Sequence, residues 1–104
     1  IMPVEIETVI NRHPKVMESA VIGVPSGLGI GEEDVKAYVV LNEKESAKPQ
    51  EIITWCADNL ADFKVPRYIE FREYFPKTGQ GKIKKNSLKE EKGGKGYDRL
   101  KGQP

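Results

Sequence analysis

The chain has 104 residues, of which 32% are charged, and its formal net charge is +1. This length suits one domain and is too short to enclose a deep cavity for a nucleotide together with an acyl chain. The balanced charge gives no electrostatic case for binding DNA or RNA, and no apolar run approaches the roughly 20 residues that span a bilayer.

The first half of the chain is predicted to hold a helix and two strands. Apolar residues at helical spacing predict a helix over residues 3–13. Small and β-branched residues predict a strand over 16–24, which Pro25 ends. Alternating apolar and polar residues predict a second strand over 35–41. With the glycine-rich loop between them, the two strands should form an antiparallel hairpin.

The second half adds a helix over 49–60, a third strand over 68–72 and a short last helix. Ser87 is expected to open that last helix, with Glu90 completing a capping box. The fold class is therefore α+β: a small sheet of about three strands with an antiparallel hairpin, flanked by two to three helices. Residues 1–91 would form the domain, and 92–104 a flexible tail rich in Gly and Lys.

The chain has one cysteine, Cys56, and one histidine, His13. A single cysteine cannot close an internal disulfide, so we expect a reducing, cytoplasmic compartment. No signal-peptide pattern opens the sequence. One Cys and one His cannot form a structural zinc site with the usual ligands, so no metal site is expected. Both lie on apolar stripes of predicted helices, which predicts a packed or capping His13 and an inert Cys56.

Basic residues gather toward the end of the chain. From Lys77 to Lys101, nine Lys or Arg stand against three acidic residues. Such a stretch is most often a solvated tail. A weak contact with the phosphates of a ligand is the functional alternative.

The segment from Pro76 to Ile83 is the most informative for chemistry. Gly79 and Gly81 give its backbone conformational freedom, and Lys82 follows as a long cationic arm. Such a cation suits a reaction in which two anions meet, for example a carboxylate attacking the α-phosphate of ATP. Taken alone, a Gly/Lys loop is more often a solvated turn.

Two phosphate-binding motifs are excluded by their spacing. A P-loop needs Gly where Pro76 stands, and Ser or Thr where Ile83 stands. The glycines at 27–31 are followed by acidic residues and then a strand, so no helix N-terminus is available for a pyrophosphate. This second segment is better interpreted as a hairpin loop.

Six short motifs follow one another between residues 3 and 88. They are PVEIE at 3–7, HPKV at 13–16, AVIGVP at 20–25, VKAYVVL at 35–41, FKVPR at 63–67 and PKTGQGKI at 76–83. In this order they resemble the C-terminal domain of the acyl-adenylate-forming superfamily, which includes acyl-CoA synthetases, luciferases and peptide-synthetase adenylation domains. Within it, medium-chain, aryl and crotonobetaine/carnitine-type CoA ligases are the most similar.

The resemblance implies a role for Lys82. In this family the lysine of the closing motif enters the active site of a large N-terminal domain. There it contacts the substrate carboxylate and the phosphate end of ATP while the acyl-adenylate forms. Thr78, Gly79 and Gly81 would belong to the loop that carries it. Mg²⁺ would accompany the ATP, bound mainly outside this chain.

The resemblance also implies a second task. After adenylation the small domain rotates, and its opposite face helps to build the channel for the CoA thiol. The connector, formed by Val65, Pro66 and Arg67, would lie near the CoA nucleotide, with Arg67 as a phosphate contact. The sequence departs from the family at Ile30, where many members have an arginine, and at Lys85, where arginine is frequent.

Together these features predict the mobile C-terminal domain of an AMP-forming acid–CoA ligase that acts on a carboxylic acid, ATP and CoA. The isolated chain is expected to bind none of ATP, Mg²⁺ or CoA and to be inactive, because the nucleotide and acyl pockets belong to the N-terminal domain. Two alternatives stay open. One is the equivalent domain of an enzyme that uses a carrier protein or oxidises its adenylate. The other is a standalone binding module without catalysis.

Overall fold

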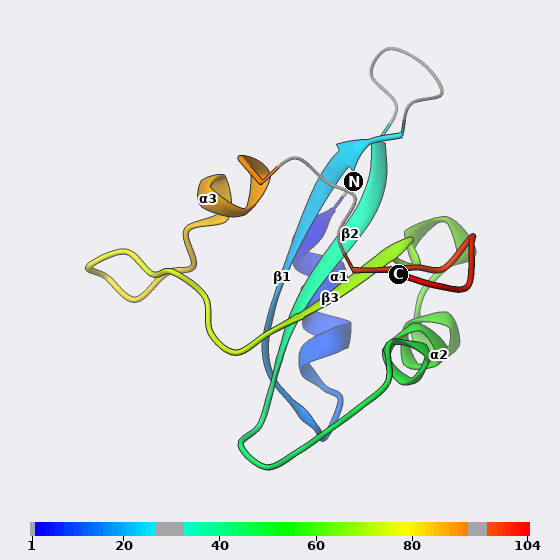
Figure 1. Ribbon diagram of the computed structural model, residues 1–104, viewed down its shortest axis with the longest axis horizontal. Helices are drawn as coiled ribbons and strands as arrows, with labels where there is room; N and C mark the ends of the chain where they lie inside the picture. Colours follow the sequence, from blue (N-terminus) through cyan, green and yellow to red (C-terminus); the bar gives the residue numbers. More distant parts are fainter. Residues whose placement is uncertain (1, 27–32, 92–95) are drawn as a thin grey trace.

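A computed structural model describes residues 2–26, 33–91 and 96–104 as one sheet with helices packed on it (Figure 1). In chain order the elements are α1 (Pro3–Asn11), β1 (Val16–Pro25), β2 (Glu33–Leu41), α2 (Pro49–Asn59), the 3₁₀-helix η1 (Asp62–Lys64), β3 (Tyr68–Arg72), α3 (Lys85–Lys89) and β4 (Tyr97–Asp98). The predicted α+β class is confirmed, with a four-stranded sheet instead of about three strands. The predicted glycine-rich hairpin loop, residues 27–31 including Ile30, lies outside the described residues.

The strands lie in the order β1-β2-β3-β4. β1 and β2 form the predicted antiparallel hairpin, in which Val21 lies opposite Ala37. β3 joins β2 in parallel, with Ile69 beside Ala37. A parallel pair needs a crossover connection, which α2 and η1 supply. β4 then pairs antiparallel with β3, so β1 and β4 are the two edges of the sheet.

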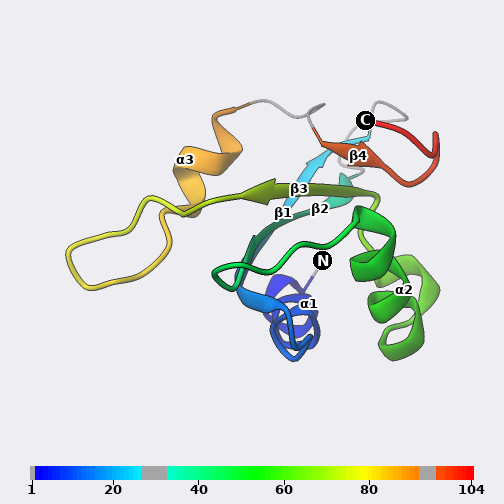
Figure 2. The same ribbon diagram turned by 60° about the horizontal axis from the view of Figure 1, so that its bottom comes forward.

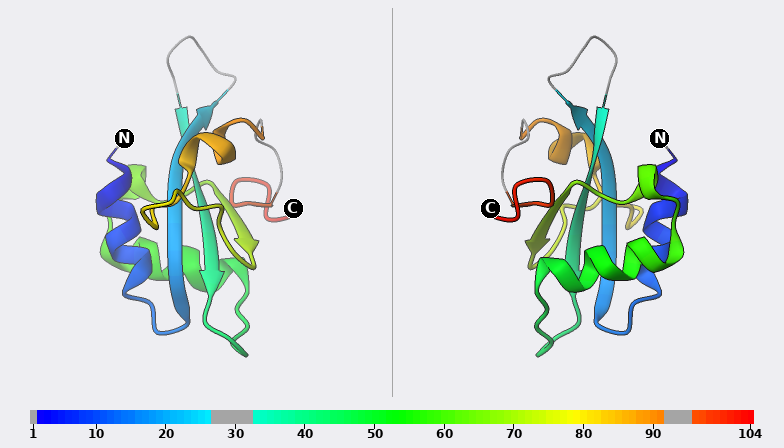
Figure 3. Two further views of the ribbon diagram at one scale, coloured as in Figure 1. Left: turned by 90° about the vertical axis from the view of Figure 1, so that its left-hand side faces the viewer. Right: turned by 90° about the vertical axis from the view of Figure 1, so that its right-hand side faces the viewer.

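α1 and α2 lie side by side on one face of the sheet (Figures 2 and 3). Their apolar stripes meet alternate residues of the strands, as the helical and strand periodicities require. The buried cluster consists of Ile6, Ile10, Val16, Val21, Val35, Ala37, Val39, Ile52, Cys56, Val65 and Ile69. Each fully buried aliphatic side chain contributes roughly 1.5–3 kcal/mol relative to an exposed one. This cluster is the main core of the domain.

α3 lies on the opposite face (Figure 2), where a second cluster forms. Its anchors are Phe75 and Leu88, which are 3% and 1% exposed. The predicted capping box is wrong, because α3 begins at Lys85 and Ser87 lies inside it with no side-chain cap. Burial of Leu88 against the sheet fixes where this short helix lies, so tertiary packing overrides the local capping signal.

The last described segment, residues 96–104, contains the fourth strand within the stretch that composition predicts to be a flexible tail. Ile69 pairs with Tyr97, and Tyr68 with Asp98. The chain then turns back, because the Asp98 N–H donates to the Gln103 carbonyl oxygen at 2.9 Å. We call residues 96–104 the C-terminal segment. Across the described residues, no helix is long and apolar enough to cross a membrane.

Candidate functional site

Residues 77–83, here called the Lys82 loop, form a narrow hairpin that projects from the body of the domain (Figures 1 and 2). An antiparallel bridge joins Lys77 to Ile83 at its base. The Thr78 N–H donates to the Lys82 carbonyl oxygen at 2.8 Å, and the Lys84 N–H donates to the Pro76 carbonyl oxygen at 2.8 Å. The loop is therefore a hydrogen-bonded turn with a defined position.

Thr78 organises the tip of the Lys82 loop. Its hydroxyl oxygen accepts hydrogen bonds from the N–H groups of Gln80 and Lys82, each at 3.2 Å. Its carbonyl oxygen accepts from the Gly81 N–H at 2.9 Å. Gly81 has a φ of 82°, which side chains disfavour. The predicted loop residues Thr78, Gly79 and Gly81 thus lie together in one turn that ends on Lys82.

Lys82 is exposed at this turn. Within residues 2–26, 33–91 and 96–104, no carboxylate forms an ion pair with it. Its neighbour Lys77, by contrast, pairs with Glu18 at 2.8 Å. The ammonium of Lys82 is therefore available to anions on another surface, at the end of a backbone that is already ordered.

The connector lies at the opposite end of β3 from the Lys82 loop (Figure 1). Val65 and Pro66 are buried against the sheet. The Arg67 N–H donates to the Val35 carbonyl oxygen at 2.9 Å, which fixes the connector to the start of β2. The two groups of predicted site residues are thus separated by β3 and do not form one constellation.

Arg67 is held by two carboxylates. Its Nε and Nη2 donate to the two Asp98 oxygens at 3.1 and 3.2 Å, and its Nη1 donates to Asp34 Oδ2 at 2.8 Å. These hydrogen bonds, Asp98 first, raise the pKa of Arg67 above its ordinary value. In return, the guanidinium lowers the pKa of the Asp98 carboxyl. The side chain of Arg67 is 19% exposed, so this cluster is only partly open to solvent.

The C-terminal segment adds two contacts that sequence patterns did not predict. The Arg99 N–H donates to the Arg67 carbonyl oxygen at 2.7 Å, and Arg99 Nε donates to the Pro66 carbonyl oxygen at 3.0 Å. Asp98 and Arg99 stand in a Gly/Lys-rich stretch without periodicity. Only the pairing of β4 with β3 brings them to the connector.

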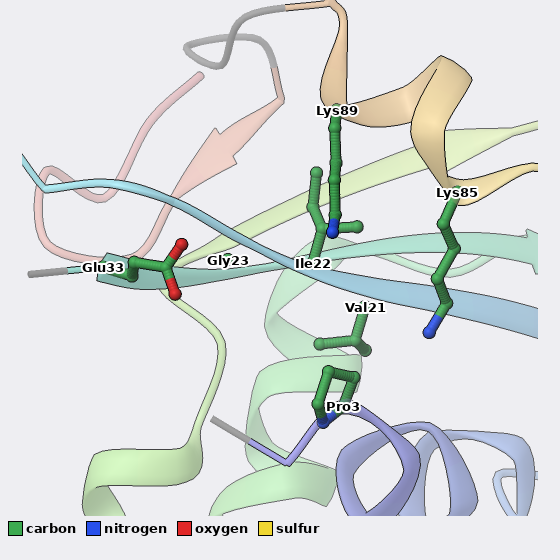
Figure 4. A pocket seen from close by; sticks show the side chains of 7 residues that line it. All are labelled: Pro3, Val21, Ile22, Gly23, Glu33, Lys85 and Lys89. Atoms are coloured by element: carbon green, nitrogen blue, oxygen red, sulfur yellow. The ribbon is translucent and has the colours of Figure 1, made fainter. Parts of the chain in front are cut away.

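A shallow hollow of about 250 Å³ lies between α3 and the outer edge of β1 (Figure 4). Lys85 and Lys89 point into it from α3, and Glu33 lies at its far end. Lys85 forms an ion pair with Glu7, whose carboxylate also accepts a hydrogen bond from the Val21 N–H at 2.8 Å. Ligand pockets usually measure roughly 300–1,000 Å³. This hollow is thus too small to hold a nucleotide by itself.

His13 and Cys56 are packing residues, as predicted. His13 Nδ1 accepts a hydrogen bond from the Lys15 N–H at 3.1 Å, and its ring meets Trp55 edge-on, with centroids 5.0 Å apart. Cys56 is fully buried, and desolvation raises the pKa of its thiol to about 12, so it is no nucleophile. In the part of the chain that the structure describes, no three His, Cys, Asp or Glu residues group as metal ligands.

A known protein family matches most of this chain. The model of the family described as the AMP-binding enzyme C-terminal domain matches residues 5–82. Its last matched residue is Lys82. The crotonobetaine/carnitine–CoA ligase of Salmonella arizonae is 45% identical over 86 residues, which cover 83% of this chain and 16% of that ligase. The chain thus spans 16% of the length of this curated relative.

Solved structures show the same fold in larger enzymes. A fatty acyl CoA synthetase of Mycobacterium tuberculosis is 39% identical with a TM-score of 0.76, over 86% of this chain and 17% of the synthetase. The anthranilate CoA ligase AuaEII, solved in complex with anthranoyl-AMP, is 34% identical with a TM-score of 0.79, over 88% of this chain and 18% of the ligase. In both, the matching part is a minor fraction of the whole protein.

Proposed function

Because the chain belongs to the AMP-binding enzyme C-terminal domain family, we propose that it is the mobile domain of an ATP-dependent acid–CoA ligase. The whole enzyme would convert a carboxylic acid, ATP and CoA into acyl-CoA, AMP and pyrophosphate. The observation that carries this proposal is Lys82, an exposed lysine without an ion-pair partner among the described residues, on a projecting, hydrogen-bonded loop.

Lys82 acts in the first half-reaction. The substrate carboxylate and the triphosphate of ATP repel each other, and an ammonium between them lowers that repulsion. The same ammonium stabilises the charge that develops on the α-phosphate as the carboxylate oxygen attacks and pyrophosphate leaves. The hydroxyl of Thr78 and the positive φ of Gly81 hold the backbone of Lys82 in place. The loop therefore delivers the cation with little ordering cost.

The connector acts in the second half-reaction. After the adenylate forms, the domain rotates so that the face carrying the β1–β2 hairpin and the connector helps to line the CoA channel. The thiol then attacks the adenylate carbonyl carbon, and AMP leaves. Support comes from the separation of the Lys82 loop and the connector by β3, because two steps can then use two ends of one domain.

The remaining parts of the reaction belong to a large N-terminal domain. The chain covers 16% of the ligase from Salmonella arizonae, so the proposed nucleotide and acid pockets, with Mg²⁺ on the ATP, lie outside it. A cytoplasmic location is part of the proposal, supported by the single, buried thiol of Cys56.

Two alternatives to a CoA ligase differ in the acyl acceptor or in catalysis. The same domain could serve an enzyme that passes its acyl group to a carrier protein or oxidises its adenylate. It could also be a standalone binding module. Product analysis of the complete protein separates the three, because only the ligase yields an acyl-CoA thioester, and the module yields no adenylate.

The test is to measure the two half-reactions of the complete protein separately. Lys82→Ala should abolish ATP–pyrophosphate exchange, because the charge-stabilising cation is gone. It should largely spare thioester formation from a preformed acyl-adenylate. The matched control is Lys77→Ala, which removes a neighbouring cation already paired with Glu18 and should leave both rates near wild type. Equal loss of both half-reactions in Lys82→Ala would contradict the assignment of this lysine to the first step.

A further inference from the structure

The charge balance at the connector makes Arg67 a poor phosphate ligand. One guanidinium faces two carboxylates, Asp34 and Asp98, and three of its nitrogens already donate to them. A phosphate that approached Arg67 would meet the negative field of both carboxylates at close range. It would also have to displace a bidentate pair, which is among the strongest side-chain interactions. Arg67 therefore has a structural role at this place.

Arg99 lies beside the same connector, but its charge is not neutralised by a neighbouring carboxylate among the described residues. It is exposed, and no carboxylate in the described part of the chain forms an ion pair with it. Its Nε donates to the Pro66 carbonyl oxygen, and its N–H donates to the Arg67 carbonyl oxygen. Among the described residues, neither of its terminal amino groups has a hydrogen-bond acceptor, which leaves four N–H donors for a ligand. The side chain is thus held at its base while its forked end remains free, which suits a phosphate.

We propose that Arg99, and not Arg67, is the cation that this domain offers to the phosphates at the nucleotide end of CoA. This inference rests on the proposed function. Arg67 and Asp98 are then positioning residues: their pairing holds β4 against β3 and thereby seats Arg99 on the connector. Arg99 lies beyond the residues 5–82 that the family model matches. With this assignment, the basic C-terminal part of the chain contributes to CoA binding.

The experiment compares CoA with pantetheine, which carries the same thiol but no phosphate, in the complete protein. Arg99→Ala should raise the KM for CoA roughly tenfold, the size of one lost charge-assisted contact. The KM for pantetheine, the KM for ATP and the rate of ATP–pyrophosphate exchange should not change. Arg99→Lys should recover part of the loss, because it keeps the charge without the fork. Arg12→Ala, which removes an exposed arginine at the end of α1, is the matched control and should match wild type.

Two results would overturn this assignment. One is an unchanged KM for CoA in Arg99→Ala together with a tenfold rise in a folded Arg67→Lys variant. The other is an equal rise for CoA and pantetheine in Arg99→Ala, which would place the defect at the thiol channel. Failure of the proposed function has a different signature: the wild-type protein itself would form no thioester with CoA or with pantetheine.

Discussion

The two glycines of the Lys82 loop have different physical roles. Gly81 has a φ of 82°, in the left-handed region that other residues reach only at a cost of roughly 1–2 kcal/mol. Gly79 has no such φ, and a Cβ built on it would meet no atom within 4 Å. Only Gly81 is therefore required by the shape of the turn that presents Lys82.

We predict that Gly81→Ala slows ATP–pyrophosphate exchange several-fold in the complete protein. Alanine disfavours the φ of 82°, so the backbone of the turn should change and move the adjacent Lys82. Gly79→Ala is the matched control and should stay within twofold of wild type. Exchange rates of both purified variants, measured at saturating ATP, test this. Equal rates for the two variants would show that the turn geometry does not matter for adenylation.

Sequence reasoning could identify the residues of the Lys82 loop because they are contiguous. It could not predict the surroundings of Arg67, whose carboxylate partners stand 33 and 31 positions away in the chain. Asp34 reaches Arg67 because β2 and β3 are parallel neighbours, and Asp98 reaches it because β4 adds to the edge. The motif alone therefore predicts a ligand contact at Arg67, and only the fold shows the two carboxylates with which it pairs.

At the scale of elements, β4 is held by side chains as much as by its ladder. The strand has two residues, so its backbone pairing with β3 is short. The Asp98 side chain is 8% exposed and accepts the bidentate pair from Arg67. It also accepts a hydrogen bond from the Leu100 N–H at 3.0 Å. One carboxylate thus supplies several of the contacts that hold the C-terminal segment.

We predict that Asp98→Ala lowers the Tm by roughly 4–8 °C, the shift expected when a domain of this size loses one substantial interaction. The exposed Asp58 on α2 provides the control, since Asp58→Ala should leave the Tm within a degree or two. Thermal unfolding followed by circular dichroism at pH 7 measures both. A wild-type Tm for Asp98→Ala would mean that β4 is not anchored by this pair.

The same pair predicts a pH dependence. Because the pKa of Asp98 is lowered in the folded state, its stabilisation is fully present above the unfolded value of about 3.9. The stabilisation is lost as the pH falls through the lowered folded pKa. The Tm difference between wild type and Asp98→Ala should therefore be constant above about pH 5 and shrink in more acidic solution.

The elements that periodicity predicted are the ones with long apolar patterns: α1, β1, β2, α2 and β3. The bounds of β3 agree at both ends, and those of α2 within one residue. β4 was not predicted, because a strand of two residues is too short to show an alternating pattern. The start of α3 was misplaced because the burial of Leu88, and not a cap, decides it. Short elements owe their place to tertiary contacts that a local pattern does not contain.

At the scale of the whole molecule, the candidate site residues Lys82 and Arg99 lie on exposed loops of the domain, and not in an enclosed pocket. Its apolar residues fill two clusters on the two faces of one sheet, and the hollow of about 250 Å³ between α3 and β1 is smaller than a usual ligand pocket. We predict that the isolated chain folds but gives no ATP–pyrophosphate exchange with any carboxylic acid. Exchange above the background of a Lys82→Ala sample would refute the division of the site between two domains.

The carboxylate of Glu7 has a consequence for how copies of this domain behave in concentrated solution. β1 is an edge strand of ten residues, and an open edge of that length is a template for strand addition and aggregation. The Val21 N–H, which points away from β2, donates a hydrogen bond to the Glu7 carboxylate. That carboxylate also forms an ion pair with Lys85. We therefore expect a second copy to pair less readily with β1 at Val21, because its strand would have to displace this carboxylate and its ion pair.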